Sequence, residues 1–208
     1  MNLPNKISCI RLALIPVFVF FFLADFIPYG KLVAAFVFAV ACFTDFLDGK
    51  IARSRGLVTN TGKFLDTIAD KVLVMAGLLC LIATPVVPEG GTVVAPTIMP
   101  IYVGTIAAIV ILAREFIISA FRQIAATKNL VLAADMYGKV KAVFQFITLI
   151  YYFVFAFLIE EFYYAIAGMA MTILSIVGYV LLAITVIMTI VSAIKYVTNN
   201  IKVLKDGQ

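Results

Sequence analysis

The sequence contains the stretch Asp45-Phe46-Leu47-Asp48-Gly49-Lys50-Ile51-Ala52-Arg53, which continues after eight residues with Gly62, after three more with Asp66, and after another three with Asp70. In a helix, residues three or four positions apart lie on one face. Asp45 and Asp48 therefore form one pair, and Asp66 and Asp70 form a second. Two antiparallel helices joined by the short segment Ser54 to Thr61 would bring the pairs together. The stretch predicts four carboxylates at one end of a helical hairpin.

The composition excludes a water-soluble globular protein. Of the 208 residues, 64% are hydrophobic and only 13% are charged, and the mean hydropathy is +1.15. A chain of this size cannot bury so much apolar surface in its own core, so lipid must cover much of it. The absence of histidine removes imidazole bases and imidazole metal ligands. The net charge of +5 reflects lysines and arginines near span ends, and no nucleic-acid partner is expected.

Apolar runs along the chain predict an all-α integral membrane protein with six transmembrane helices. One membrane domain covers residues 1–208, and the motif-bearing second and third helices occupy about 31–83. The last run has no polar turn, so we expect one helix there. The six runs are Leu12–Ala24, Leu32–Thr44, Val72–Pro88, Gly90–Ala113, Ala142–Ile159 and Phe162–Ile194.

The charges near the span ends predict the orientation. With six spans and both termini inside, every lysine and arginine except Lys31 lies on the cytoplasmic side. Lysine and arginine are retained on that side of a membrane. We expect a multi-pass protein of the plasma membrane with its aspartates at the cytoplasmic face. The side predicted to lie outside also carries Asp25, Glu89, Glu160 and Glu161.

The four aspartates predict a metal site. A carboxylate near the hydrocarbon region is costly and usually functional, and four together repel one another unless cations lie between them. Oxygen ligands suit hard divalent ions, with Mg²⁺ the first choice and Mn²⁺ or Ca²⁺ as substitutes. Two bridged divalent cations suit displacement at phosphorus. The small residues Gly49, Ala52 and Gly62 would let a bulky ligand approach, although small residues also permit close helix packing.

The quoted stretch resembles the signature of the CDP-alcohol phosphotransferase family at every fixed position. The resemblance implies the six-helix fold of that family, usually a homodimer, with an intramembrane polar cavity open to the cytoplasm. It also implies transfer of a phosphatidyl or related group from a CDP-linked donor to an alcohol with release of CMP. It makes Asp45, Asp48 and Asp66 ligands of one cation, and Asp45, Asp66 and Asp70 ligands of the second. Asp70 is also the implied general base. The implied donor-binding residues are Gly49, Ala52, Arg53, Gly62 and, more weakly, Thr59, which is equally a candidate helix N-cap.

Three further segments resemble the bacterial members of the family that use CDP-diacylglycerol as donor and sn-glycerol 3-phosphate as acceptor. These segments are residues 2–8 with Arg11 and Pro16, residues 113–122, and residues 138–141. The likeness extends from residue 1 to about 145. Thr67 and Ala142 depart from the usual residues of that group. The resemblance implies phosphatidylglycerophosphate and CMP as products.

A phosphate-bearing acceptor needs cations, and four basic residues lie near the predicted inner ends of the fourth and fifth spans. Arg114 and Arg122 are about 80° apart on a helical wheel, so both can border one cavity. Lys139 and Lys141 are about 200° apart, so only one can face it, and we favour Lys139. The alternative is that these residues are topological markers or snorkelling anchors. The predicted acceptor-binding residues are Arg114, Arg122, Lys139 and Lys141.

Two other functions remain open at this point. A related CDP-alcohol phosphotransferase that forms cardiolipin or a phosphatidylinositol phosphate would share the same stretch. A cation transporter would also use intramembrane carboxylates, but they would be expected near mid-membrane along a path. The four aspartates instead cluster at one end, beside arginines.

Overall fold

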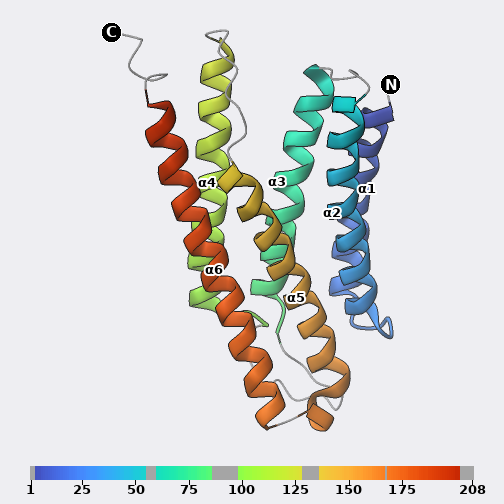
Figure 1. Cartoon of the computed structure of the whole chain (residues 1–208). Helices are drawn as coiled ribbons and strands as arrows, with labels where there is room; N and C mark the ends of the chain where they lie inside the picture. Colours follow the sequence, from blue (N-terminus) through green and yellow to red (C-terminus); the bar gives the residue numbers. More distant parts are fainter. Residues whose placement is uncertain (1–2, 55–59, 86–97, 128–135, 167, 202–208) are drawn as a thin grey trace.

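The computed structural model describes residues 3–54, 60–85, 98–127, 136–166 and 168–201, with the backbone alone for 3–5, 45–54, 60, 61, 63 and 127. The described ranges contain six α-helices and no strand, which confirms the all-helical prediction (Figure 1). The helices are α1 (Leu3–Leu23), α2 (Gly30–Ser54), α3 (Asn60–Ala83), α4 (Ile101–Thr127), α5 (Met136–Ile166) and α6 (Met169–Asn200).

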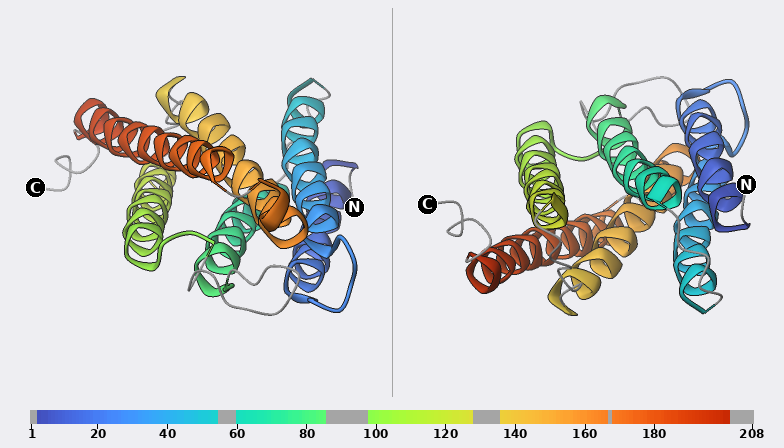
Figure 2. Two further views of the ribbon diagram at one scale, coloured as in Figure 1. Left: turned by 90° about the horizontal axis from the view of Figure 1, so that it is seen from below. Right: turned by 90° about the horizontal axis from the view of Figure 1, so that it is seen from above.

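The helices run alternately up and down, so the ends that carry the motif gather together. At one end of the bundle α1, α3 and α5 begin, and α2, α4 and α6 end (Figure 1). We call this the polar end. Helix α5 lies between a group formed by α1, α2 and α3 and a group formed by α4 and α6 (Figure 2). The two groups also meet directly where α3 contacts α4.

Four of the helices are long and apolar enough to cross a membrane: α1 from Lys6, α4, α5 and α6. The apolar part of α2, Gly30–Thr44, is shorter because Asp45 and the charges after it occupy the last turns of that helix. Large apolar side chains are exposed on the outer faces, among them Phe36, Ile106 and Ile176. A surface of this kind is stable in lipid and not in water. The chain is a multi-pass membrane protein.

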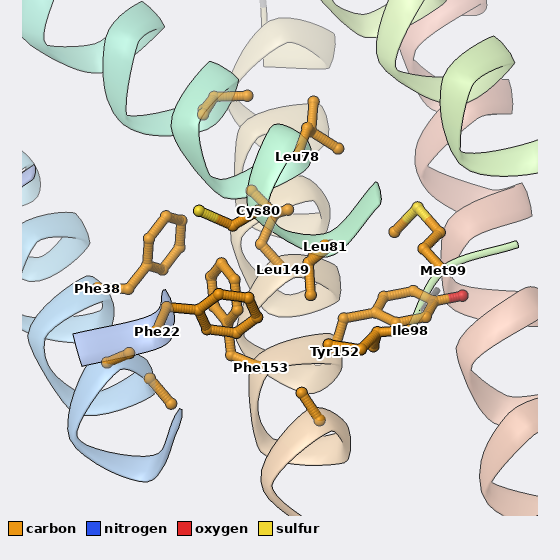
Figure 3. Close-up of a cluster of buried hydrophobic side chains, with 14 of the residues drawn as sticks. Phe22, Phe38, Leu78, Cys80, Leu81, Ile98, Met99, Leu149, Tyr152 and Phe153 are labelled. Carbon is orange, nitrogen blue, oxygen red and sulfur yellow. The ribbon is translucent and has the colours of Figure 1, made fainter. Parts of the chain in front are cut away.

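An aromatic cluster joins α1, α2 and α5 inside the bundle (Figure 3). The rings of Phe38 and Phe153 lie 4.8 Å apart between centroids, and Phe18 lies 5.4 Å from Phe38 and 5.2 Å from Phe153. Phe22 contacts Phe153 edge-on at 5.2 Å. Tilted and edge-to-face rings at these distances attract one another beyond their burial of apolar area. This cluster fixes the N-terminal helices against α5.

The boundary between α5 and α6 differs from the prediction. The sequence runs placed Glu160 and Glu161 between two helices, but α5 continues through them to Ile166, with a kink at Phe162. The reason is Lys31 of α2, whose ammonium is buried 2.7 Å from Glu160 Oε1 and neutralises it. The break falls at Gly168, whose φ of 91° suits glycine. The last run is one helix, as predicted, but it begins at Met169.

The start of the fourth helix also differs from the prediction. The apolar run suggested a span from Gly90, whereas α4 begins at Ile101, directly after Pro100. Proline is well tolerated just before or within the first turn of a helix, where no intrahelical amide bond is lost. The helix also continues past Ala113, where the apolar run ended, to Thr127. Arg114 and Glu115 therefore lie in the middle of α4 rather than at its end.

Candidate active site

The quoted stretch lies where α2 ends and α3 begins, at the polar end (Figure 1). Asp45, Asp48, Gly49, Ala52 and Arg53 belong to the last turns of α2, and their side chains lie outside the described residues, as does all of Thr59. On α3, Gly62, Asp66 and Asp70 follow one another at one-turn intervals. The helical spacing predicted for the second aspartate pair is therefore confirmed.

Asp66 is paired with a buried arginine of the first helix. Arg11 Nη1 donates a hydrogen bond to Asp66 Oδ1 at 3.0 Å. The Arg11 side chain is 0% exposed, whereas that of Asp66 is 48% exposed. Helix α1 packs along α3, and this packing places the Arg11 guanidinium next to the Asp66 carboxylate. One side of the Asp66 carboxylate is thus held by a cation, while much of the side chain stays accessible.

Asp70 lies one turn further along α3 than Asp66. It is close enough to Lys141 of α5 for their charges to attract each other. Lys71, its neighbour, acts in the same way on Glu115 of α4. Asp70 and its neighbour Lys71 therefore each influence one member of the Lys141–Glu115 pair.

Arg114 of α4 and Lys141 of α5 form a buried cluster with the carboxylate of Glu115. Lys141 is 1% exposed and donates a hydrogen bond to Glu115 Oε1. Arg114 Nη1 lies 3.4 Å from the same oxygen, and its Nη2 donates to Ser192 Oγ of α6 at 2.7 Å. A Cβ atom on Gly138 would lie 3.2 Å from Arg114 Nη2, so glycine allows this guanidinium to lie against the α5 backbone. Helices α4, α5 and α6 therefore meet at Arg114. This is possible because α5 begins well below the end of α4, beside the middle of that helix (Figure 1).

The second arginine of α4 faces the same neighbouring helix. Arg122 Nε donates to Tyr196 Oη at 3.4 Å, and its guanidinium carbon lies 5.7 Å from the centre of that ring. Ser192 and Tyr196 are one turn apart on α6. The prediction that Arg114 and Arg122 share one side of α4 is confirmed.

The choice between the two lysines of α5 was wrong. We expected only one of them to face the interior, and this is confirmed, but it is Lys141 and not Lys139. Lys139 is exposed, whereas Lys141 is buried beside Glu115. A helical wheel gives the angle between two residues, but it does not show which side of the helix faces the interior. The contact between Lys141 and Glu115 shows that this is the side of Lys141.

Sequence reasoning missed three residues of this region: Arg11, Glu115 and Ser192. Glu115 had a detectable signal, because a carboxylate in the middle of an apolar helix is costly and needs a partner. Arg11 carried the same signal in an apolar run but was interpreted as a topology marker. Ser192 had none, since an isolated serine in a membrane helix commonly bonds its own backbone.

The donor chemistry of the aspartates suits a hard divalent cation. Among the described side chains, no group of three or more metal-ligating residues comes together. Asp45 and Asp48, which complete the predicted set, lie outside those side chains. Asp66 and Asp70 supply carboxylate oxygens one turn apart, and Arg11 already accompanies Asp66 as a counter-charge. These residues fit oxygen coordination of Mg²⁺ or Mn²⁺.

The chain belongs to the CDP-alcohol phosphatidyltransferase family, which matches residues 1–191. Three relatives share the name CDP-diacylglycerol--glycerol-3-phosphate 3-phosphatidyltransferase. The protein of Bacillus subtilis (strain 168) is 40% identical over 157 residues, which are 70% of this chain and 73% of the relative. That of Rickettsia bellii (strain RML369-C) is 32% identical over 195 residues, 94% and 93% of the two chains. An Arabidopsis thaliana protein, whose name ends in 2, is 37% identical over 152 residues, 71% and 62% of the two chains.

Proposed function

We propose that this protein is a phosphatidylglycerophosphate synthase. It transfers the phosphatidyl group of CDP-diacylglycerol to sn-glycerol 3-phosphate and releases CMP. The observation that carries the proposal is the pair of buried cations Arg114 and Lys141, which meet at Glu115; the charge of Asp70 also attracts Lys141. Arg114 Nε has no hydrogen-bond partner among the described residues, so a buried donor is available for an anion. The names of the relatives agree with this acceptor.

The reaction is a displacement at phosphorus. A free hydroxyl of glycerol 3-phosphate attacks the phosphorus that bears the diacylglycerol, and Asp70 accepts the hydroxyl proton. A new phosphorus–oxygen bond forms, and the bond between that phosphorus and the bridging oxygen of the diphosphate breaks. The electron pair leaves with CMP. The acceptor phosphate takes no part in bond making, and Arg114, Arg122 and Lys141 hold it in place.

The aspartates are proposed to hold two divalent cations, Mg²⁺ first and Mn²⁺ as a substitute. Asp45, Asp48 and Asp66 would bind one cation, and Asp45, Asp66 and Asp70 the second. When bound, the cations supply electrostatic stabilisation of the charge that develops on the diphosphate oxygens. Support comes from the oxygen-only donor set and from the one-turn spacing of Asp66 and Asp70.

The donor nucleotide is proposed to lie against the small residues at the polar end. Gly62 lies one turn before Asp66 on α3, where the lack of a side chain leaves room beside the carboxylate. Gly49, Ala52, Arg53 and Thr59 complete the proposed donor-binding set. Arg53 would pair with the diphosphate, because a guanidinium binds phosphate oxygens through two parallel hydrogen bonds.

The proposal also includes the location of the protein, its oligomeric state and its orientation in the membrane. The protein lies in the plasma membrane as a homodimer with both termini and the active site on the cytoplasmic side, where a soluble phosphate ester is available. The distribution of lysine and arginine supports this orientation. The whole chain, residues 1–208, forms one membrane domain.

The test is lipid synthesis by the purified protein. CDP-diacylglycerol, Mg²⁺ and labelled glycerol 3-phosphate should give labelled phosphatidylglycerophosphate and an equal amount of CMP. Parallel reactions offer labelled inositol phosphate, phosphatidylglycerol or unphosphorylated glycerol as acceptor. Preferential incorporation of any of these three would assign the chain to a different acceptor. Cation flux without lipid synthesis in reconstituted vesicles would instead indicate a transporter.

A further inference from the structure

A carboxylate lies between two of the cations proposed to bind an anion. Glu115 Oε1 accepts the hydrogen bond of Lys141 and lies 3.4 Å from Arg114 Nη1. Glu115 itself is only 17% exposed. In a site built simply for positive charge, a buried carboxylate would weaken the attraction for phosphate. Its presence needs a separate reason.

The surroundings of Lys141 supply that reason. Its side chain is 1% exposed, and an ammonium removed from water stays charged only beside a partner. Two carboxylates attract it, Glu115 through a hydrogen bond and Asp70 through its charge. If Lys141 paired with Asp70 instead, it would occupy the group proposed to accept the substrate proton and to bind a cation.

We propose that Glu115 is a positioning residue that determines how the acceptor is bound. It holds the Lys141 ammonium on the α4 side, next to Arg114, and away from Asp70. The inference rests on the proposed function, because the acceptor phosphate is the ligand of this cation pair. Arg114 contacts Glu115 through Nη1 and is fixed from its other side by Ser192 of α6 through Nη2. Its Nε has no hydrogen-bond partner among the described residues, so a donor is left for phosphate.

Two simpler accounts make opposite predictions. If Glu115 acts only through its charge, removing that charge makes the region more positive and tightens binding of glycerol 3-phosphate. If Glu115 only stabilises the fold, its removal lowers thermal stability and leaves the kinetic constants of the folded fraction unchanged. In the positioning account, the KM for glycerol 3-phosphate rises, and this rise depends on Lys141.

The experiment is a double-mutant cycle with Glu115→Gln, Lys141→Met and the double variant. Both single variants should raise the KM for glycerol 3-phosphate about tenfold or more, as expected when a charge-assisted contact is lost, while the KM for CDP-diacylglycerol stays unchanged. The double variant should be no worse than Lys141→Met alone, because Glu115 acts through that lysine. Glu115→Asp, which keeps the charge but shortens the reach, should be intermediate. Lys6→Met, at an exposed residue of α1, and Glu161→Gln, near the other end of α5, are matched controls.

A second measurement applies even if turnover is lost. Glycerol 3-phosphate added without donor should raise the melting temperature of the parent protein, and the concentration required should increase in Glu115→Gln. Additive effects in the double variant, tighter acceptor binding in Glu115→Gln, or an unchanged acceptor requirement would each overturn the inference. A parent protein that does not use glycerol 3-phosphate would instead refute the proposed function.

Discussion

Arg11 on α1 donates a hydrogen bond of 3.0 Å to Asp66 on α3, and it does so from a fully buried position. The pair is asymmetric, because the guanidinium has no access to water whereas the carboxylate is half exposed. The buried cation therefore depends on the aspartates, and Asp66 keeps a face for another ligand. Hydrogen-bond partners of metal-binding carboxylates orient them for the metal.

The first prediction concerns this pair. Arg11→Met removes the counter-charge of Asp66, so the aspartate cluster should depend more on added cations for its stability. We expect Mg²⁺ to raise the melting temperature of Arg11→Met by roughly 2–6 °C more than that of the parent protein. Lys6→Met, an exposed charge on the same helix, is the control. Equal gains in the two variants would mean that Arg11 does not neutralise the cluster.

The second prediction separates the roles of the aspartates. Asp45→Asn, Asp48→Asn and Asp66→Asn should increase the Mg²⁺ concentration needed for half-maximal rate. Asp70→Asn should lower kcat by about 10²–10⁴ even at saturating Mg²⁺, because it removes the proposed base. Initial rates over a Mg²⁺ titration measure both effects. Normal kcat in Asp70→Asn would remove it as the base, and full activity of the parent protein in excess chelator would contradict the metal site.

The third prediction concerns the acceptor phosphate. Arg114→Ala and Lys141→Met should each cost about 1.5–3 kcal/mol in kcat/KM for glycerol 3-phosphate. Arg122→Ala should cost less, because its guanidinium is on an exposed residue. Both buried-site variants should discriminate less between glycerol 3-phosphate and glycerol. If they instead raised only the KM for CDP-diacylglycerol, these cations would belong to the donor site.

The fourth prediction tests the orientation. In a background without Cys9, Cys42 and Cys80, single cysteines are placed at Met169 and Thr198, which are exposed at opposite ends of α6. An impermeant thiol reagent should label the cysteine at Met169 in intact cells and the one at Thr198 only after permeabilisation. The permeabilised sample confirms that Thr198→Cys can react. The reverse pattern would place the polar end outside.

Hydropathy was sufficient for the architecture but not for every boundary. It correctly predicted a helical membrane protein, and the described part of the chain contains the six helices expected, since apolar runs in lipid have few other stable forms. It misplaced the end of α5 because Glu160 looked like a loop residue. Its partner Lys31 is 129 positions away in the sequence, and no local pattern reveals a neutralising contact of that range.

In the candidate site, too, local sequence patterns predicted the features of single helices but not the contacts between helices. The spacing of Asp66 and Asp70 is a local property of one helix, and it was predicted correctly. The direction of Lys141 and the burial of Arg11 depend on contacts between helices: the ion pair that joins α5 to α4 at Glu115 and the packing of α1 against α3 at Asp66. Such contacts follow from the packing of the whole bundle.

The aromatic cluster of Phe18, Phe22, Phe38 and Phe153 gives the bundle an uneven resistance to opening. These rings lock α1, α2 and α5 together, whereas the polar end is joined by charged contacts that a ligand can rearrange. Local fluctuations follow the density of buried apolar contacts. Backbone amides around Phe38 and Phe153 should therefore exchange with deuterium most slowly, and those around Gly62 and Gly138 faster. The half of the bundle that holds the aromatic cluster is therefore expected to be its most rigid part.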